Sequence, residues 1–157
     1  MTINSDYLAP CGLYCGVCGI LYATRDNNMR FLELLLTMYK SKVPGIDHLT
    51  TEDLLCDGCL SERRSIFCRV CTIRDCVQDK GIEGCNKCDE FPCKQIEAFP
   101  VDVGKKVILR AIPYWREHGT EKWVHDEELR YHCPECGHKL FRGAKRCNKC
   151  KTPVDCD

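Results

Sequence analysis

The residues of this chain that can do chemistry are cysteines, and the first three lie close together at Cys11, Cys15 and Cys18. The glycines between them allow the tight backbone that brings several thiolates to one metal ion. The C-x3-C-x2-C spacing also suits three ligands of an iron–sulfur cluster. This triad therefore predicts a metal centre, and the spacing leaves open both the metal and the fourth ligand. His48 is one candidate for that ligand, although an ordinary loop histidine is the simpler interpretation.

Most of the other cysteines come in C-x2-C pairs, each of which is half of a tetrahedral thiolate site. The sequence has no basic leader followed by a long apolar stretch and no apolar membrane span, so we expect a cytoplasmic protein that does not enter a membrane. In a reducing cytoplasm metal ligation is favoured over disulfides. The predicted metal ligands are Cys11, Cys15, Cys18, Cys56, Cys59, Cys68, Cys71, Cys76, Cys85, Cys88, Cys93, Cys133, Cys136, Cys147 and Cys150. Cys156, on a polar tail, is expected to be a bystander.

The cysteines before residue 100 do not divide into complete sets of four. Proximity in the sequence predicts two sets of four, which are Cys56, Cys59, Cys68 and Cys71, and then Cys76, Cys85, Cys88 and Cys93. Interleaved sites, such as Cys56/Cys59 with Cys85/Cys88, are an alternative. Either way the opening triad is left with three thiols. We expect three to four zinc ions in all, with an iron–sulfur cluster at Cys11, Cys15 and Cys18 as the alternative for that site.

The composition indicates how such a chain must be stabilised. Its apolar share of 44% includes 16 cysteines among 157 residues. Without them about a third remains, which is less than in most globular domains, so bound metal must supplement the core. We predict a small metal-stapled fold of short helices and irregular loops with treble-clef-like zinc knuckles, followed by a C-terminal β zinc ribbon. Residues 1–100 would form the cysteine-rich domain, 101–130 a helical connector packing on it, and 131–157 the ribbon.

Local patterns predict the helices that position these cysteines. An amphipathic helix is expected over residues 24–42, capped by Asp26 and burying an apolar face of Phe31, Leu34, Leu35 and Met38. Thr50 is a predicted N-cap of a short helical turn that precedes Cys56.

Four further helices are expected along the chain. Residues 72–80 should form a helix that carries Cys76 and ends at Gly81. Pro92 should open another helix with Cys93 in its first turn. In the connector, an apolar face continues across Pro113, which predicts a helix kinked there and ended by Gly119, with a second helix after it.

The cysteine motifs also resemble those of a known family. Cys11-Gly-Leu-Tyr-Cys-Gly-Val-Cys18, Cys56-Asp-Gly-Cys59, Cys71-Thr-Ile-Arg-Asp-Cys76 and Cys85-Asn-Lys-Cys-Asp-Glu-Phe-Pro-Cys93 are similar to those of a bacterial and archaeal cysteine-rich domain of unknown function, presumed to bind zinc. The resemblance covers about residues 7–100 and implies metal ligation but no reaction. Residues 133–150 separately resemble the zinc ribbons appended to many microbial proteins. The triad also has the spacing of radical S-adenosylmethionine enzymes, but Val17 stands where those enzymes usually have an aromatic residue, and no βα repeats follow.

Three functions are compatible with these patterns. The favoured one is a zinc-binding, non-catalytic adaptor module whose partner is a protein, because complete thiolate sites are usually structural. A nucleic-acid-binding role is the first alternative, since the ribbon carries six basic side chains and two aromatic ones: Lys139, Arg142, Lys145, Arg146, Lys149, Lys151, Tyr131 and Phe141. The second alternative is an iron–sulfur or open-site metalloenzyme that uses the opening triad. We lean against an enzyme.

Overall fold

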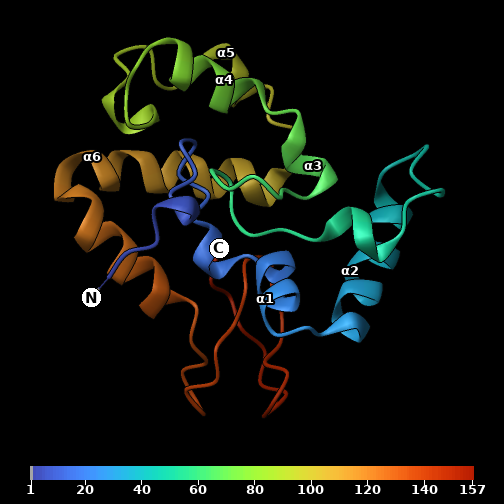
Figure 1. The fold of residues 1–157 in the computed structure, drawn as a ribbon. Helices are drawn as coiled ribbons and strands as arrows, with labels where there is room; N and C mark the ends of the chain where they lie inside the picture. The colour runs from blue at the N-terminus through green and yellow to red at the C-terminus, as the bar shows by residue number, and fades with distance from the viewer. Residues whose placement is uncertain (1) are drawn as a thin grey trace.

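Helices and loops build the molecule, and no β-strand occurs in residues 2–157, the part that the computed structural model describes (Figure 1). The α-helices are α1 (Gly19–Arg25), α2 (Met29–Lys42), α3 (Ile66–Arg69), α4 (Thr72–Asp79), α5 (Lys94–Glu97) and α6 (Asp102–Arg130). Single turns of 3-10 helix occur at η1 (Ser5–Tyr7), η2 (Cys15–Val17), η3 (Thr51–Leu54) and η4 (Cys85–Lys87). The prediction of a small fold made of short helices and loops is confirmed.

The longest helix, α6, consists of two arms that meet at Gly119. This glycine has a φ of 80°, and it is the residue of α6 whose backbone angles leave the helical region. Figure 1 shows the chain changing direction sharply within α6. The predicted helix end at Gly119 is confirmed, whereas the kink lies there and not at Pro113, because glycine reaches a positive φ at little cost.

The two arms of α6 are fastened to each other by buried side chains. The rings of Trp115 and Trp123 stack with their centroids 4.1 Å apart. Arg110 on the first arm pairs with Glu127 on the second, and the Glu127 residue is only 2% exposed. A buried charge is tolerated when it is paired in this way. The bend is therefore fixed, and it gives the rest of the chain a rigid corner on which to pack.

The predicted helix over residues 24–42 is instead two helices, α1 and α2. Asn28 caps α2, and its Oδ1 accepts a hydrogen bond from the Phe31 amide at 3.0 Å. The buried face of α2 is Leu32, Leu35 and Leu36, whereas Leu34 is 62% exposed. Both the Asp26 cap and the predicted apolar face were wrong in part. Leu32, Leu35 and Leu36 also follow i, i+3, i+4 spacing, so the pattern admitted two faces.

The shorter elements match the predictions more closely. The Thr50 amide donates to Asp53 Oδ2 at 2.8 Å in a capping box that opens η3. Helix α4 carries Cys76 and ends before Gly81, which has a φ of 63°. Helix α5 is a single turn that begins at Lys94, so Cys93 is its N-cap and not part of its first turn.

The C-terminal segment has no β ribbon, and that prediction was wrong. Its cross-strand pairing consists of two isolated bridges, His132 with Lys139 and Arg146 with Pro153. Each bridge closes a separate C-x2-C loop. The pairing ends quickly because a cysteine turn occupies the centre of each loop and leaves too few residues beside it for a ladder.

One hydrophobic core joins distant parts of the chain. Tyr14 and Val17 from the opening motif, Ile112 from α6, and Tyr131 and Leu140 from the C-terminal segment belong to one buried cluster. A second, smaller cluster packs α1 and α2 against Leu49, Leu54 and Cys56. The C-terminal segment is thus packed into the main core. In residues 2–157 there is no helix both long enough and apolar enough to cross a membrane.

Candidate metal centre

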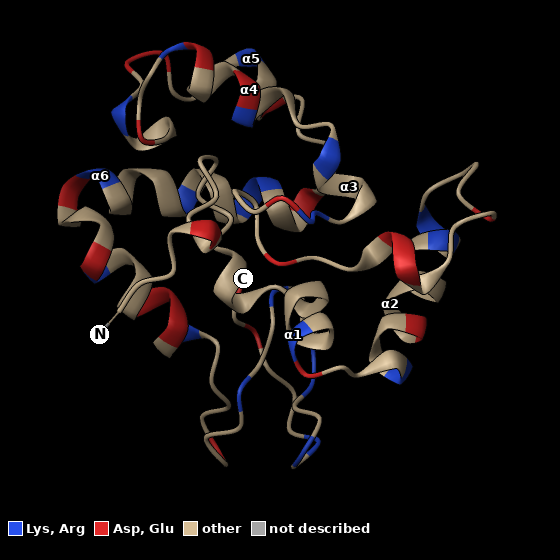
Figure 2. Ribbon diagram, in the orientation of Figure 1, with Lys and Arg blue, Asp and Glu red and all other residues tan. Residues whose placement is uncertain are grey.

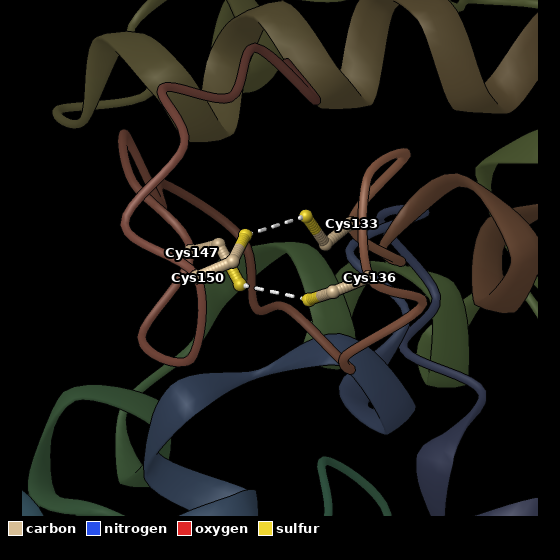
Figure 3. A group of neighbouring side chains, drawn as sticks. All are labelled: Cys133, Cys136, Cys147 and Cys150. Carbon is tan, nitrogen blue, oxygen red and sulfur yellow. Dashed lines mark hydrogen bonds between the residues drawn. The ribbon is translucent and has the colours of Figure 1, made fainter.

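Four cysteines of the C-terminal segment meet at one point. The sulfur atoms of Cys133, Cys136, Cys147 and Cys150 all lie within 4.8 Å of one another. Figure 3 shows one pair of cysteines on each loop, with the four sulfurs facing inward. The sulfurs of Cys133 and Cys150 are 3.5 Å apart, and those of Cys136 and Cys147 are 3.6 Å apart. This group can hold a metal ion.

Local backbone hydrogen bonds shape each of the two loops. In the first, the Cys133 amide donates to the His138 carbonyl and the Gly137 amide to the Cys133 carbonyl, both at 2.8 Å. In the second, the Cys147 amide donates to the Thr152 carbonyl at 2.9 Å and the Lys151 amide to the Cys147 carbonyl at 3.0 Å. Each loop ends in a left-handed residue, Gly137 or Lys151. Two similar turns thus aim their sulfurs at one point.

The electrostatics of this centre favour thiolate at two positions. The hydroxyl of Thr152, whose Oγ1 lies 3.3 Å from Cys150 Sγ, and then the backbone amide of Thr152 lower the pKa of Cys150 to about 6. A hydrogen bond from the Cys150 amide lowers the pKa of Cys147. Since the thiolate is the form that binds metal, both residues are prepared for ligation.

The basic side chains of this segment divide into an outer group and one inward residue. Figure 2 shows Lys and Arg along the C-terminal loops, and Lys139, Lys145, Arg146, Lys149 and Lys151 are all exposed. Arg142 instead turns toward the opening motif. Its guanidinium donates to the Tyr14 carbonyl at 2.6 Å, and its backbone amide donates to the Val17 carbonyl at 2.8 Å.

The two aromatic residues of this segment are not available for stacking on bases. Tyr131 is fully buried, and Phe141 packs on Phe31 with ring centroids 5.1 Å apart. The nucleic-acid interpretation therefore retains only exposed lysine and arginine side chains, which a solvated surface explains equally well.

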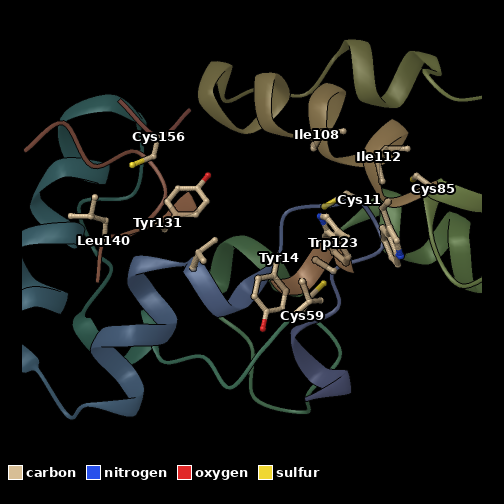
Figure 4. Packing of buried hydrophobic residues seen from close by; sticks show 14 of the residues in the cluster. Cys11, Tyr14, Cys59, Cys85, Ile108, Ile112, Trp123, Tyr131, Leu140 and Cys156 are labelled. Carbon is tan, nitrogen blue, oxygen red and sulfur yellow. The ribbon is translucent and has the colours of Figure 1, made fainter. Parts of the chain in front are cut away.

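The opening triad lies against the first arm of α6. Gly12 has a φ of 85°, and a Cβ placed on it would lie 2.9 Å from Ile112 Cδ1. Glycine at this position therefore allows both the turn and the close approach to α6. Figure 4 shows Cys11 and Cys59 in the same packed cluster as Ile112 and Trp123. Burial, with smaller contributions from the neighbouring thiols of Cys59 and Cys71, raises the pKa of Cys11 to about 12.

The thiols nearest to the opening triad come from the stretch 56–71. Burial raises the pKa of Cys15, and Cys18 and Cys59 add to the effect. Burial also raises the pKa of Cys68, with Cys18 and Cys56 adding to it. The triad and the set predicted from proximity at Cys56, Cys59, Cys68 and Cys71 are therefore neighbours in space. The sequence left the triad one ligand short, and Cys59 and Cys71 belong to the same packed cluster as Cys11 and Cys15.

Two arginines lie beside these thiols: Arg74, which the sequence did not single out, and Arg142, which it grouped with the basic residues of the C-terminal segment. Arg74 is 5% exposed and donates to the Cys68 carbonyl at 2.6 Å. The Nε of Arg142 is buried and has no hydrogen-bond partner among the described residues. Burial disfavours the charged form of Arg142, but the neighbouring Cys18, Cys15 and Cys11 raise its pKa overall. A buried cation needs such negative charge nearby. The only sequence signal was their position, since both lie within three residues of a buried apolar side chain.

The remaining upstream cysteines form their own neighbourhood. Burial raises the pKa of Cys85 to about 11, and Cys88, Cys93 and Cys76 follow as smaller causes. These are the four residues that proximity grouped together. Within residues 2–157, however, the C-terminal cysteines are the only set of three or more Cys, His, Asp or Glu residues that meets the 4.8 Å spacing.

His48 and Cys156 are the two remaining residues that the sequence singled out. His48 is exposed and belongs to no such set within the described residues. Cys156, predicted to be a bystander on a polar tail, lies outside the four-cysteine cluster. It is 7% exposed and belongs to the main core, so the tail that carries it is packed. The Gly143 amide donates to Asp157 Oδ2 at 2.7 Å, which holds this tail in place.

These features define a cysteine-rich, mostly helical protein with a four-cysteine cluster that can bind metal. A family model described as a protein of unknown function (DUF3795) matches residues 7–98, which is more than half of the chain. The chain belongs to this family, and the resemblance seen in its cysteine motifs is confirmed. No curated protein and no solved structure matches it.

Proposed function

We propose that the protein binds zinc at Cys133, Cys136, Cys147 and Cys150. The sulfur spacing supports this assignment. A zinc ion with four bonds of 2.3 Å to sulfur has tetrahedral edges of about 3.8 Å. The observed separations of 3.5 and 3.6 Å fit such an ion closely. A larger iron–sulfur cluster needs its ligands further apart, so a single ion suits this site better.

The role we propose for this zinc is structural. Four thiolates fill the coordination sphere of zinc and leave no position for a substrate or an activated water. Cys133 and Cys147 also belong to the main core, so the ion would fasten the C-terminal segment to the rest of the protein. We infer that the protein is a non-catalytic binding module with a protein partner. A closed site of this kind holds the surrounding surface in shape and has no open position for a reaction.

Metal analysis of two matched variants tests the zinc assignment. Cys150→Ser removes an exposed ligand, whereas Cys156→Ser removes a buried thiol in the same segment that lies outside the cluster. We expect the Cys150 variant to contain one zinc ion fewer per chain than the wild type, and the Cys156 variant to keep the wild-type content. Equal zinc content in all three proteins, measured by mass spectrometry of the metal, would contradict the proposal.

A further inference from the structure

A hollow beside α4 and α5 is lined by a second set of four cysteines. It has a volume of about 550 Å³ and is lined by Cys76, Cys85, Cys88 and Cys93 among other residues. Cys76 lies on α4, Cys85 begins η4, Cys88 directly follows η4, and Cys93 caps α5. Three separate elements thus deliver four sulfurs to one cavity.

The sulfurs around this cavity stand further apart than those of the C-terminal centre. No three of them satisfy the 4.8 Å spacing that Cys133, Cys136, Cys147 and Cys150 satisfy within the described residues. A single tetrahedral zinc ion would require edges of about 3.8 Å. The same chain therefore holds one compact four-cysteine set and one wider set, and the wider set lines a half-open hollow.

We propose that Cys76, Cys85, Cys88 and Cys93 bind an iron–sulfur cluster. Such a cluster takes four cysteine ligands and places several iron and sulfide atoms between them, which separates the sulfurs and fills a cavity. The spacing Cys85-x2-Cys88-x4-Cys93 contains the two intervals of the C-x4-C-x2-C motif used by plant-type [2Fe–2S] proteins, in reverse order. A single zinc ion would explain the four cysteines but leave the hollow empty.

The other walls of the hollow carry apolar side chains, Lys80 and the carboxylates of Glu90 and Glu97, and Lys80 also pairs with Glu90. Ile73 and Val77 on α4 are 6% and 4% exposed, and both contribute apolar lining. The ammonium group of Lys80 lies 3.5 Å from Cys88 Sγ and donates to it. A hydrogen bond to a ligand sulfur and a nearby positive charge both stabilise a thiolate-ligated cluster and tune its reduction potential.

Anaerobic reconstitution of the full chain with iron and sulfide tests this proposal. We expect a brown protein with equal amounts of bound iron and acid-labile sulfide. Cys88→Ser and Cys93→Ser should lose the visible absorption and the iron. Cys150→Ser should keep both while losing zinc, so the two metal assignments can fail independently. A colourless wild-type protein that takes up no iron would overturn the proposal.

Three more variants, Cys15→Ser, Lys80→Met and Lys80→Arg, locate the cluster even where a ligand variant fails to fold. Cys15→Ser should keep the iron. If Cys15→Ser lost the iron and Cys88→Ser kept it, the cluster would belong to the opening triad and this assignment would be overturned. Lys80→Met leaves all four ligands in place and should lower the reduction potential of the cluster, because a positive charge beside a sulfur favours the reduced state. Lys80→Arg should restore most of the shift. An unchanged potential in Lys80→Met would also contradict this location.

Discussion

The C-terminal cysteines and the cysteines before residue 100 differ in how their sulfurs are brought together and in the pKa values of their thiols. The C-terminal set is compact, with sulfurs 3.5 and 3.6 Å apart and two thiols of lowered pKa. Upstream, burial raises the pKa of Cys11, Cys15, Cys59, Cys68 and Cys85. In the first set the loops lower the pKa of Cys147 and Cys150, although the pKa of Cys136 is raised to about 11. The five upstream thiols must instead be deprotonated against the cost of burial.

The difference follows from which interactions hold each set of cysteines in place. Each C-terminal loop is closed by hydrogen bonds within six residues, so its geometry is local. The upstream cysteines are assembled by long-range packing. The Cys85 amide donates to the Pro10 carbonyl at 2.8 Å, and the Cys56 amide donates to Thr24 Oγ1 at 3.1 Å. Buried arginines, Arg74 and Arg142, then supply positive charge where local amides do not. A metal centre can therefore be built either from a short turn or from a whole core.

The largest effect expected is the loss of cooperative folding when metal is removed. Structural zinc contributes about 10–16 kcal/mol of binding free energy, which is as large as the stability of a typical domain. Because Cys133 and Cys147 lie in the same core as Tyr14 and Ile112, we expect this loss to spread beyond the C-terminal segment. A strong chelator should abolish the cooperative thermal transition seen by circular dichroism, and added zinc should restore it. A chelated protein that still melts cooperatively would show that the core does not depend on metal.

A smaller effect is expected from replacing one glycine in each region, Gly12 in the opening motif and Gly143 in the C-terminal segment. Gly12 and Gly143 have nearly the same φ, 85° and 84°, but only Gly12 meets neighbouring atoms. Alanine at Gly143 should cost about 1–2 kcal/mol from its left-handed backbone alone. At Gly12 the same change should cost about 1–3 kcal/mol more, because its methyl group would clash with the fully buried Ile112. Urea denaturation of both variants measures the difference. Equal costs would mean that the opening motif is not held tightly against α6.

The sequence predicted the ligand types and local turns better than the assembly. C-x2-C spacing identified the four cysteines that meet at the C-terminus, because two covalently short loops can hardly place their sulfurs elsewhere. The same reasoning could not show that Cys59 and Cys71 share a packed cluster with Cys11, since that depends on the tertiary fold. It grouped Arg142 with the basic residues of the C-terminal segment and did not show that its guanidinium turns inward. The ribbon prediction was wrong because metal loops need no strands around them.

The smallest effect concerns Thr152, which supports the C-terminal centre without binding metal. Its hydroxyl is the largest cause, followed by its backbone amide, of the lowering of the Cys150 pKa to about 6 from an ordinary value of 9.0. A lowered pKa favours the metal-binding form above that value, and the advantage is lost as the pH falls through it. Without the hydroxyl the pKa should rise, so protons would compete for the sulfur at higher pH.

Thr152→Val should therefore weaken zinc binding by about 10-fold, within the range found when a partner of a metal ligand is removed. It should also move acid-induced zinc release to a higher pH. Both are measured by titration against a coloured chelator between pH 8 and pH 4, with Thr37→Val on α2 as the control, since Thr37 bonds only to the Glu33 carbonyl. Superimposed release curves for the two variants would show that the neighbouring amides, and not the Thr152 hydroxyl, prepare this centre. The local character of the C-terminal site would then rest on its backbone alone.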